Sequence, residues 1–126
     1  MRHLPRGHAA GADRGAAAVE MALVLPLLAA VLFGIIDFGR MFNAQISLTE
    51  AAREGARAVA LGLDPDTRIA ATLGAVPGTP EVTACAGDRD DDAVVALRQE
   101  FEAITPVDAL LGGVTLTATG VMPCAG

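Results

Sequence analysis

One carboxylate interrupts the longest apolar run of the chain. From Ala16 to Ile36 the sequence reads AAAVEMALVLPLLAAVLFGII, and Glu20 is its only charged residue. A carboxylate within an apolar helix costs free energy unless water or a partner reaches it. Glu20 is therefore either an interfacial side chain that extends into water or a residue with a partner elsewhere.

The two cysteines, Cys85 and Cys124, are the next residues whose chemistry matters. Both lie at the ends of strand-like segments, and in an oxidising compartment they are expected to form a disulfide. The bridge would close a loop of about 40 residues and contribute about 3–4 kcal/mol in the chain-entropy account. Two free thiols are the alternative. A zinc site would need two further ligands, and His3 and His8 precede the apolar run, on its other side.

No grouping of residues predicts catalysis, a cofactor or a metal. Both histidines lie in the basic head, and Ser47 is the only serine and has no base near it in the sequence. Asp88, Asp90 and Asp92 have the spacing that begins a Ca²⁺ loop. However, Ala93 replaces its glycine and Gln99 its bidentate glutamate, which favours a solvated acidic turn. We therefore expect a protein that is not an enzyme.

Length and composition exclude two further classes of function and indicate a membrane segment. The chain has 126 residues, of which 52% are hydrophobic, and a formal net charge of -6. The length excludes a large multidomain enzyme, and the acidic balance excludes a nucleic-acid partner, since phosphate binding needs a basic face. The hydrophobic residues are concentrated in Ala16–Ile36, which as a helix would span about 31 Å, close to the hydrocarbon thickness of a bilayer. We predict a transmembrane helix over residues 16–36.

Flanking charge predicts the orientation of this helix. Residues 1–15 form a basic head that contains Arg2, Arg6 and Arg14, whereas Asp37 and Arg40 follow the helix and cancel each other. The positive-inside tendency places the N-terminus in the cytoplasm and the remainder outside. The head, rich in Gly, is not expected to form a packed element.

The helix is expected to continue outside the membrane over residues 37–62. This segment contains no Pro, and its charged residues fall into i,i+3 pairs that suit a solvated helix face. Gly62 is a suitable C-terminal cap. Apolar residues at helical spacing are expected to form one stripe, comprising Phe38, Phe42, Ile46, Ala52, Ala56 and Val59.

Residues 63–126 predict a small α+β module. Asp64 followed by Pro65 begins a short helix over residues 66–75. Strands are expected over residues 81–86, 93–104 and 114–122. The segment 93–104 also fits helical spacing, and we favour a strand. The fold class is therefore α+β, with a long N-terminal transmembrane helix followed by a short helix and a few antiparallel strands.

The stretch RGAAAVE, from Arg14 to Glu20, resembles a type IV prepilin processing site. The resemblance implies that a prepilin peptidase cuts after Gly15 and exposes the amine of Ala16. Glu20 would then be the fifth residue of the mature chain. Its carboxylate would pair with the N-terminal ammonium of a neighbouring subunit and so set the register between subunits, because two buried opposite charges offset each other's desolvation.

A longer resemblance is carried by AAVEMALVLPLL, GIIDFGR and AAREGAR, and more weakly by the tail LTATGVMPCAG. These segments resemble the TadE-like family, the TadE/TadG-type minor pseudopilins of Flp pilus and tight-adherence systems. Departures are Met21 where Phe is usual, Asp37 where Glu is frequent, and Pro123 where Arg is common.

The family resemblance implies a single-pass bacterial membrane protein that takes part in assembly of a Flp-type pilus or a related secretion apparatus. Its partners would be membrane lipid, other pilin or pseudopilin subunits, the assembly machinery and a prepilin peptidase. Pro26 matches the family's Leu-Pro step, and its missing donor predicts a helix kink within the membrane. A Pro that the membrane helix merely tolerates is the alternative.

Two rival functions stay open at this point. One is a membrane-tethered binding or accessory module that is not processed and does not enter a filament. The other is a secreted precursor whose apolar segment is an ordinary signal peptide. The second rival is disfavoured because the apolar run exceeds a usual signal-peptide core and no small-x-small cleavage site follows it before Asp37.

Overall fold

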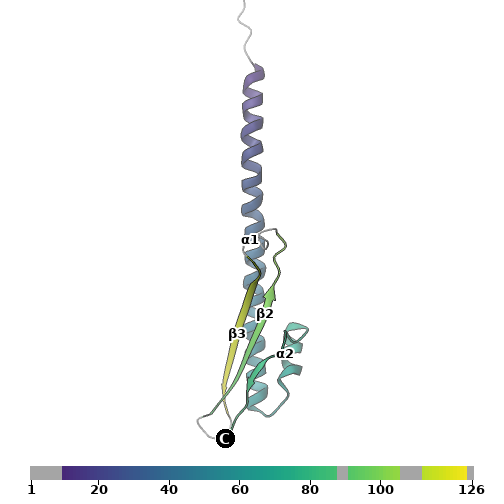
Figure 1. The fold of residues 1–126 in the computed structure, drawn as a ribbon, viewed down its shortest axis with the longest axis vertical. Coiled ribbons are helices and arrows are strands. Elements are labelled where there is room, and N and C mark those ends of the chain that lie inside the picture. Colours follow the sequence, from purple (N-terminus) through teal and green to yellow (C-terminus); the bar gives the residue numbers. More distant parts are fainter. Residues whose placement is uncertain (1–9, 88–90, 106–111, 125–126) are drawn as a thin grey trace, which may run out of the picture. The chain divides into compact units, whose positions relative to one another are not determined.

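The computed structural model describes residues 10–87, 91–105 and 112–124. The chain divides into two compact units, Met1–Ile36 and Asp37–Gly126, and each is described by itself. The structure confirms the α+β class (Figure 1). Its elements are α1 (Ala10–Ala60), α2 (Pro65–Leu73), β1 (Glu81–Thr83), β2 (Asp92–Phe101) and β3 (Val114–Pro123).

The first unit consists, over its described residues, of the N-terminal part of α1. This helix begins at Ala10, so the last residues of the basic head are helical, whereas the sequence predicts only that the head forms no packed element. The reason is that extending an existing helix by alanine-rich sequence is easy, whereas starting a new one is costly. Pro26 lies inside α1. The helix continues through Pro26 without a break, and the kink stays a prediction.

The C-terminus of α1 ends in a glycine cap, as the sequence predicts. Gly62 adopts the left-handed conformation, with φ of 70°. Its N–H donates to the carbonyl of Val59 at 3.0 Å, and the N–H of Leu63 donates to the carbonyl of Ala58 at 2.8 Å. These two bonds form the Schellman motif, which satisfies carbonyls that the helix end would leave without partners.

The short helix α2 is fixed at both ends by the residues that predict it. The Asp64 carboxylate accepts hydrogen bonds from the N–H groups of Asp66 and Thr67, and Pro65 occupies the first turn. The helix ends at Leu73 instead of continuing to residue 75, because Gly74 takes the left-handed conformation with φ of 82°.

Three strands form one antiparallel sheet in the order β1-β2-β3. The ambiguous segment is a strand, as favoured, but it covers Asp92–Phe101 and ends before residue 104, and buried side chains alternate along it at Ala93, Val95 and Leu97. β1 is shorter than expected and ends at Thr83, which pairs with Val94. Beyond Thr83 the chain leaves the ladder toward the position where Cys85 forms its disulfide.

The core of the second unit lies between α1 and one face of the sheet. The helix contributes mainly small residues, while the sheet and α2 contribute larger ones. The buried cluster comprises Leu48, Ala51, Ala52, Ala56, Val59, Ile69, Ala93, Val95, Leu97, Leu116 and Ala118. Small side chains on the helix let the sheet approach its backbone closely. The approach is closest at Gly120, where an added Cβ would lie 2.1 Å from the carbonyl oxygen of Ala52.

The single apolar stripe expected along residues 38–59 is wrong. Ala52, Ala56 and Val59 are buried, whereas Phe38, Phe42 and Ile46 are exposed. The six residues between Ile46 and Ala52 rotate the helix by about 600°, that is about 240° beyond one full turn, so the two groups lie on different faces.

Candidate functional site

The apolar part of the first unit exposes its side chains all round. Every residue from Ala16 to Ile36 is exposed, and Leu23 reaches 72%. By length and composition α1 is able to cross a membrane once. The most apolar 18-residue window has a mean hydropathy of 2.5, and none of that window is buried. Such a surface needs an apolar environment or other helices to cover it, as expected of a single-pass membrane protein.

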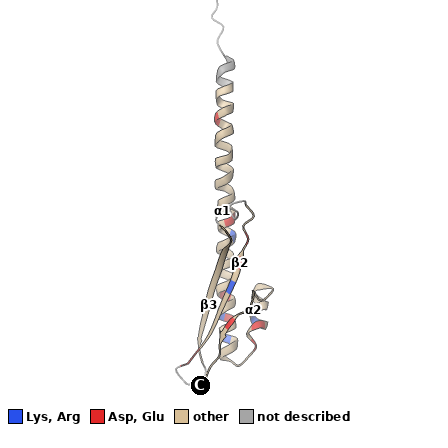
Figure 2. Cartoon of the chain, viewed as in Figure 1, with Lys and Arg blue, Asp and Glu red and all other residues tan. Residues whose placement is uncertain are grey.

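Glu20 is the one charged side chain within this apolar surface. It is exposed and forms no hydrogen bond or ion pair with the part of the chain that the structure describes. Figure 2 shows how the charged residues gather instead on the second unit. The register role predicted for Glu20 needs a group from outside this chain, and it stays a prediction.

The predicted processing bond, Gly15–Ala16, lies inside α1. Within the part of the chain that the structure describes, a Cβ built at Gly15 would meet nothing within 4 Å. A glycine inside a helix costs about 1 kcal/mol relative to alanine, so the helix is intrinsically weak at this bond. Cleavage after Gly15 remains a prediction.

In the second unit, Asp37 on α1 forms hydrogen bonds with the segment that follows β2. Its carboxylate accepts hydrogen bonds from the Ile104 N–H at 3.1 Å, the Thr105 N–H at 3.3 Å and the Thr105 hydroxyl at 2.5 Å. The guanidinium of Arg40 lies 3.6 Å from the same carboxylate. The Thr105 hydroxyl, and then the two backbone N–H groups and Arg40, lower the pKa of Asp37 despite partial desolvation.

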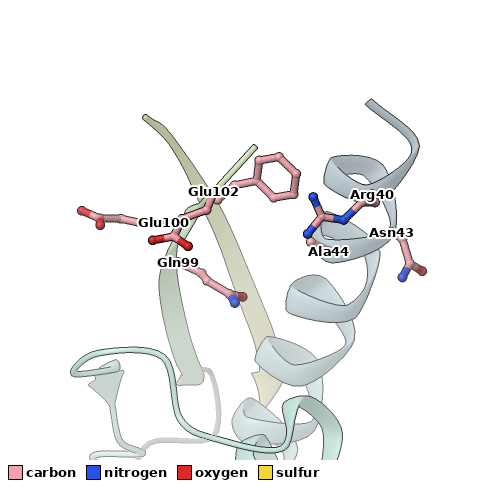
Figure 3. A pocket seen from close by; sticks show the side chains of 7 residues that line it. Arg40, Asn43, Ala44, Gln99, Glu100 and Glu102 are labelled. Carbon is pink, nitrogen blue, oxygen red and sulfur yellow. The ribbon is translucent and has the colours of Figure 1, made fainter. Parts of the chain in front are cut away.

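Arg40 also borders an open groove between α1 and the end of β2. Its guanidinium lies 5.5 Å from the ring centre of Phe101, a cation–π distance. Figure 3 shows the Arg40 side chain pointing from the helix toward the strand. The groove has a volume of about 450 Å³ and is lined by Arg40, Asn43, Ala44, Gln99, Glu100, Phe101 and Glu102. The groove is open, and its lining contains one basic side chain together with several polar and acidic ones. It therefore lacks the enclosed, apolar character of a small-molecule site.

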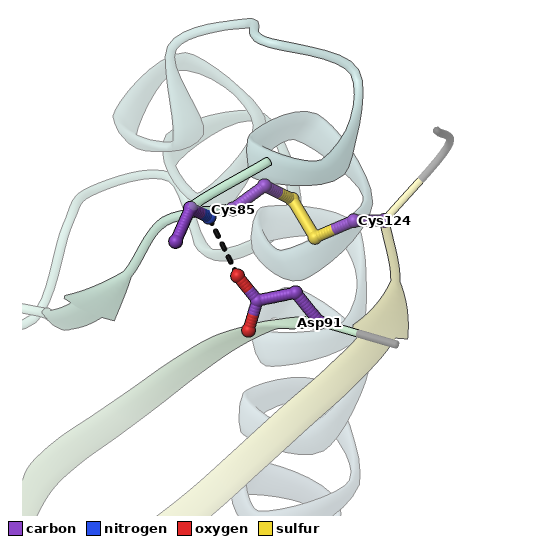
Figure 4. The surroundings of a disulfide bond; sticks show 4 residues. Cys85, Asp91 and Cys124 are labelled. Carbon is purple, nitrogen blue, oxygen red and sulfur yellow. Dashed lines mark hydrogen bonds between the residues drawn. A yellow bond between two sulfur atoms is a disulfide. The ribbon is translucent and has the colours of Figure 1, made fainter. Parts of the chain in front are cut away.

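The structure confirms the disulfide between Cys85 and Cys124, whose Cα atoms lie 6.0 Å apart. The bridge follows β1 and β3, the outer strands, and so joins them at the end where β2 begins (Figure 4). Asp91 accepts hydrogen bonds from the backbone on both sides of the bridge, next to Cys85 and at Cys124. Its carboxylate accepts from the Ala86 N–H at 2.6 Å, and its carbonyl accepts from the Cys124 N–H at 3.0 Å.

The acidic stretch is described only in part, because Asp88 and Asp90 lie outside the described residues. Among the residues that are described, no group of three or more His, Cys, Asp or Glu side chains is placed to hold a metal ion.

Two important positions are not evident from the sequence. Asp37 bonds to residues 67 and 68 positions further along the chain, and no local pattern signals such a partner. Gly120 interrupts a strand pattern, and an isolated glycine there does signal close backbone approach. That signal does not identify Ala52 as the group approached.

Comparison with known proteins supports the family resemblance for part of the chain. The family described as TadE-like protein matches residues 15–57, which include AAVEMALVLPLL, GIIDFGR and AAREGAR. The C-terminal tail lies outside this match, and its resemblance stays an expectation. No significant match is found among curated proteins or among solved structures.

Proposed function

We propose that this chain, TadE-like over residues 15–57, is a pseudopilin that takes part in assembly of a Flp-type pilus or a related tight-adherence apparatus. In this proposal the chain crosses the bacterial cell membrane once. The N-terminus is cytoplasmic and the second unit is extracytoplasmic. The protein is not an enzyme, and its partners are lipid, other pilin-like subunits and the assembly machinery.

This proposal rests on one observation: an apolar helical surface contains a single charged residue, and no other described part of the chain packs against it. Residues 16–36 are exposed throughout, and Glu20 has no partner in the described part of the chain. Lipid satisfies the apolar side chains but leaves the carboxylate costly. A neighbouring subunit that brings an ammonium group satisfies both, which favours assembly over simple anchoring.

Processing would supply that ammonium group. Hydrolysis of the Gly15–Ala16 bond by a prepilin peptidase adds one water, leaves a carboxylate on Gly15 and creates a new amine on Ala16. The cut also removes the basic leader, residues 1–15. The amine is protonated at neutral pH and would pair with Glu20 of the next subunit, since paired buried charges offset each other's desolvation.

One observation favours a second candidate, the tethered module that is not processed and does not enter a filament. α1 begins at Ala10, which places the Gly15–Ala16 bond inside a helix. Proteases cut extended, exposed segments most readily, so this bond must unwind before it is cut. Without the cut, the apolar helix would serve as an anchor only.

The mass of the membrane-extracted protein distinguishes these functions. An N-terminus at Ala16 supports the processed pseudopilin. An intact N-terminus at Met1 or Arg2 supports the tethered module. An N-terminus beyond Ile36 overturns both and supports a secreted precursor.

Incorporation into pili tests the role of Glu20. We expect Glu20→Ala to disappear from the sheared pilus fraction while its amount in the membrane is unchanged. The matched control is Glu100→Ala, because Glu100 is an exposed carboxylate on β2. If Glu20→Ala enters pili as well as the control does, the register role is wrong.

A further inference from the structure

Three large apolar side chains lie exposed in a row on α1 within the second unit. Phe38, Phe42 and Ile46 are exposed by 63%, 61% and 44%. They are spaced four residues apart, so they share one face of the helix. The core uses a different face, which carries Leu48 and Ala52. We call Phe38, Phe42 and Ile46 the outer row.

Lipid cannot cover the whole outer row. Asp37 is the first residue beyond the expected membrane span, and at 1.5 Å per residue Phe42 lies about 8 Å and Ile46 about 14 Å further along the helix. The headgroup layer on each side of a bilayer is about 5–8 Å thick. Ile46 therefore lies beyond the lipid, and only protein is able to cover it.

The helix surface beyond the outer row carries charges of alternating sign. Glu50, Arg53, Glu54 and Arg57 follow one another along α1, and Glu50, Arg53 and Arg57 are exposed. Within the described residues none of these four side chains forms an ion pair. Their opposite charges remain available to a partner.

This charge pattern is complementary to itself at one particular offset. Two copies anchored in one membrane have parallel helices. Without a shift between the helices, each charged residue would face the same residue of the other copy, and the like charges would repel each other. Shifting one copy by three residues, about 4.5 Å along the axis, brings Glu50 level with Arg53 and Glu54 level with Arg57. The same shift keeps the two outer rows in contact, because each row extends over about 12 Å of the helix axis and the offset is only about 4.5 Å.

We propose that the outer row and the four charges form a contact surface for a second copy of this chain, packed parallel with a shift of about one helical turn. This inference rests on the proposed function only in that both copies share one membrane and one orientation. The offset contact pairs Glu50 and Glu54 of one copy with Arg53 and Arg57 of the other and uses the outer row of both, so each contact joins two copies.

Cross-linking in membranes tests the surface. The full chain carrying Ile46→Cys is incorporated into membrane vesicles and treated with a short bismaleimide. Cys85 and Cys124 are bonded to each other, so the introduced thiol is the only free one. We expect a covalent dimer. The matched control is Thr72→Cys on α2, which is also exposed and should give none. An equal dimer yield from the control overturns the proposal.

Charge reversal tests the offset. In the Ile46→Cys background, Glu50→Arg alone and Arg53→Glu alone each bring like charges together and should abolish the dimer. The combined reversal restores opposite charges and should recover it. An intact Cys85–Cys124 bridge in each variant, checked by alkylation, verifies folding. A dimer yield that is insensitive to the single reversals overturns the offset arrangement.

Failure of this surface and failure of the proposed function give different results. If the wild-type chain enters pili but Ile46→Cys forms no dimer, the surface is wrong and the pseudopilin role stands. If the dimer forms but the wild-type chain is absent from the pilus fraction, the pilus role is wrong and the surface stands.

Discussion

The backbone of β3 at Gly120 lies directly against the backbone of α1 at Ala52. A Cβ added at Gly120 would lie 2.1 Å from the Ala52 carbonyl oxygen and 2.4 Å from its carbonyl carbon. No side-chain rotation relieves such a contact, because both partners are backbone. The helix and the strand must therefore separate to accept any residue other than glycine.

We expect Gly120→Ala to lower the free energy of unfolding by about 3 kcal/mol or more, at the upper end of overpacking changes. The control is Gly113→Ala, since a Cβ at Gly113 meets none of the described residues within 4 Å. Urea unfolding of the full chain in detergent, followed by circular dichroism, measures both. Equal stability of the two variants would contradict the close approach.

Ile69 connects α2 to the core, and its side chain is fully buried. It lies against the helix at Gly55, where an added Cβ would meet the Ile69 side chain at 3.1 Å. We expect Ile69→Ala to cost about 2–5 kcal/mol of unfolding free energy through a cavity beside Val95. Leu61→Ala, at a position 60% exposed, should change the stability by much less in the same urea titration. Comparable losses in both variants would argue against α2 as part of the core.

The disulfide should account for a large share of the stability of the second unit. Alkylation of the non-reduced, unfolded protein should label neither Cys85 nor Cys124. Replacing both with alanine should lower the free energy of unfolding by about 4 kcal/mol, because the bridge closes a loop of about 40 residues. Two labelled thiols in protein extracted from its natural compartment would refute the bridge there.

Asp37 should make the contact with Thr105 dependent on pH. The pKa of Asp37 is held below its ordinary value of 3.8, first by the Thr105 hydroxyl. A lowered folded-state pKa means that the carboxylate stabilises the fold above 3.8, and that this stabilisation is lost as the pH falls through the folded-state value.

Hydrogen exchange of the Ile104 and Thr105 amides measures this effect. We expect Asp37→Asn to reduce their protection near pH 7, and the difference from wild type to shrink as the pH falls below the folded-state pKa. Thr105→Val should raise the pKa of Asp37 and move the loss of protection to higher pH. A difference between wild type and Asp37→Asn that does not change with pH would exclude the ionised carboxylate as its cause.

Local patterns predict several of these elements correctly. The run from Ala16 to Ile36 and the absence of Pro beyond it predict the long helix. Alternating Thr residues predict β3, and Asp64–Pro65 predicts where α2 begins. Each of these signals acts within a few residues, through caps, periodicity or backbone propensity.

Long-range relationships could not be predicted in the same way. The bonds from Asp37 to Thr105 and the approach of Gly120 to Ala52 depend on how distant segments meet. Helical spacing alone predicts one stripe that joins the outer row to Ala52, Ala56 and Val59. Which face is covered depends on where the sheet lies, and one sequence does not state that position. Of the candidate site residues, the cysteines are confirmed as a disulfide, while Gly15, Ala16, Glu20 and Pro26 stay predictions.

The packing of Leu116, Ala118 and Gly120 against α1 also has a consequence for biosynthesis. The ribosome makes the chain from its N-terminus, so α1 emerges well before β3, which supplies part of its cover. Until β3 has been made, the core face of the helix stays open and the unit lacks its longest-range contacts. Folding must therefore follow synthesis of the last strand, and an exposed helix face is what a chaperone would meet in the interval.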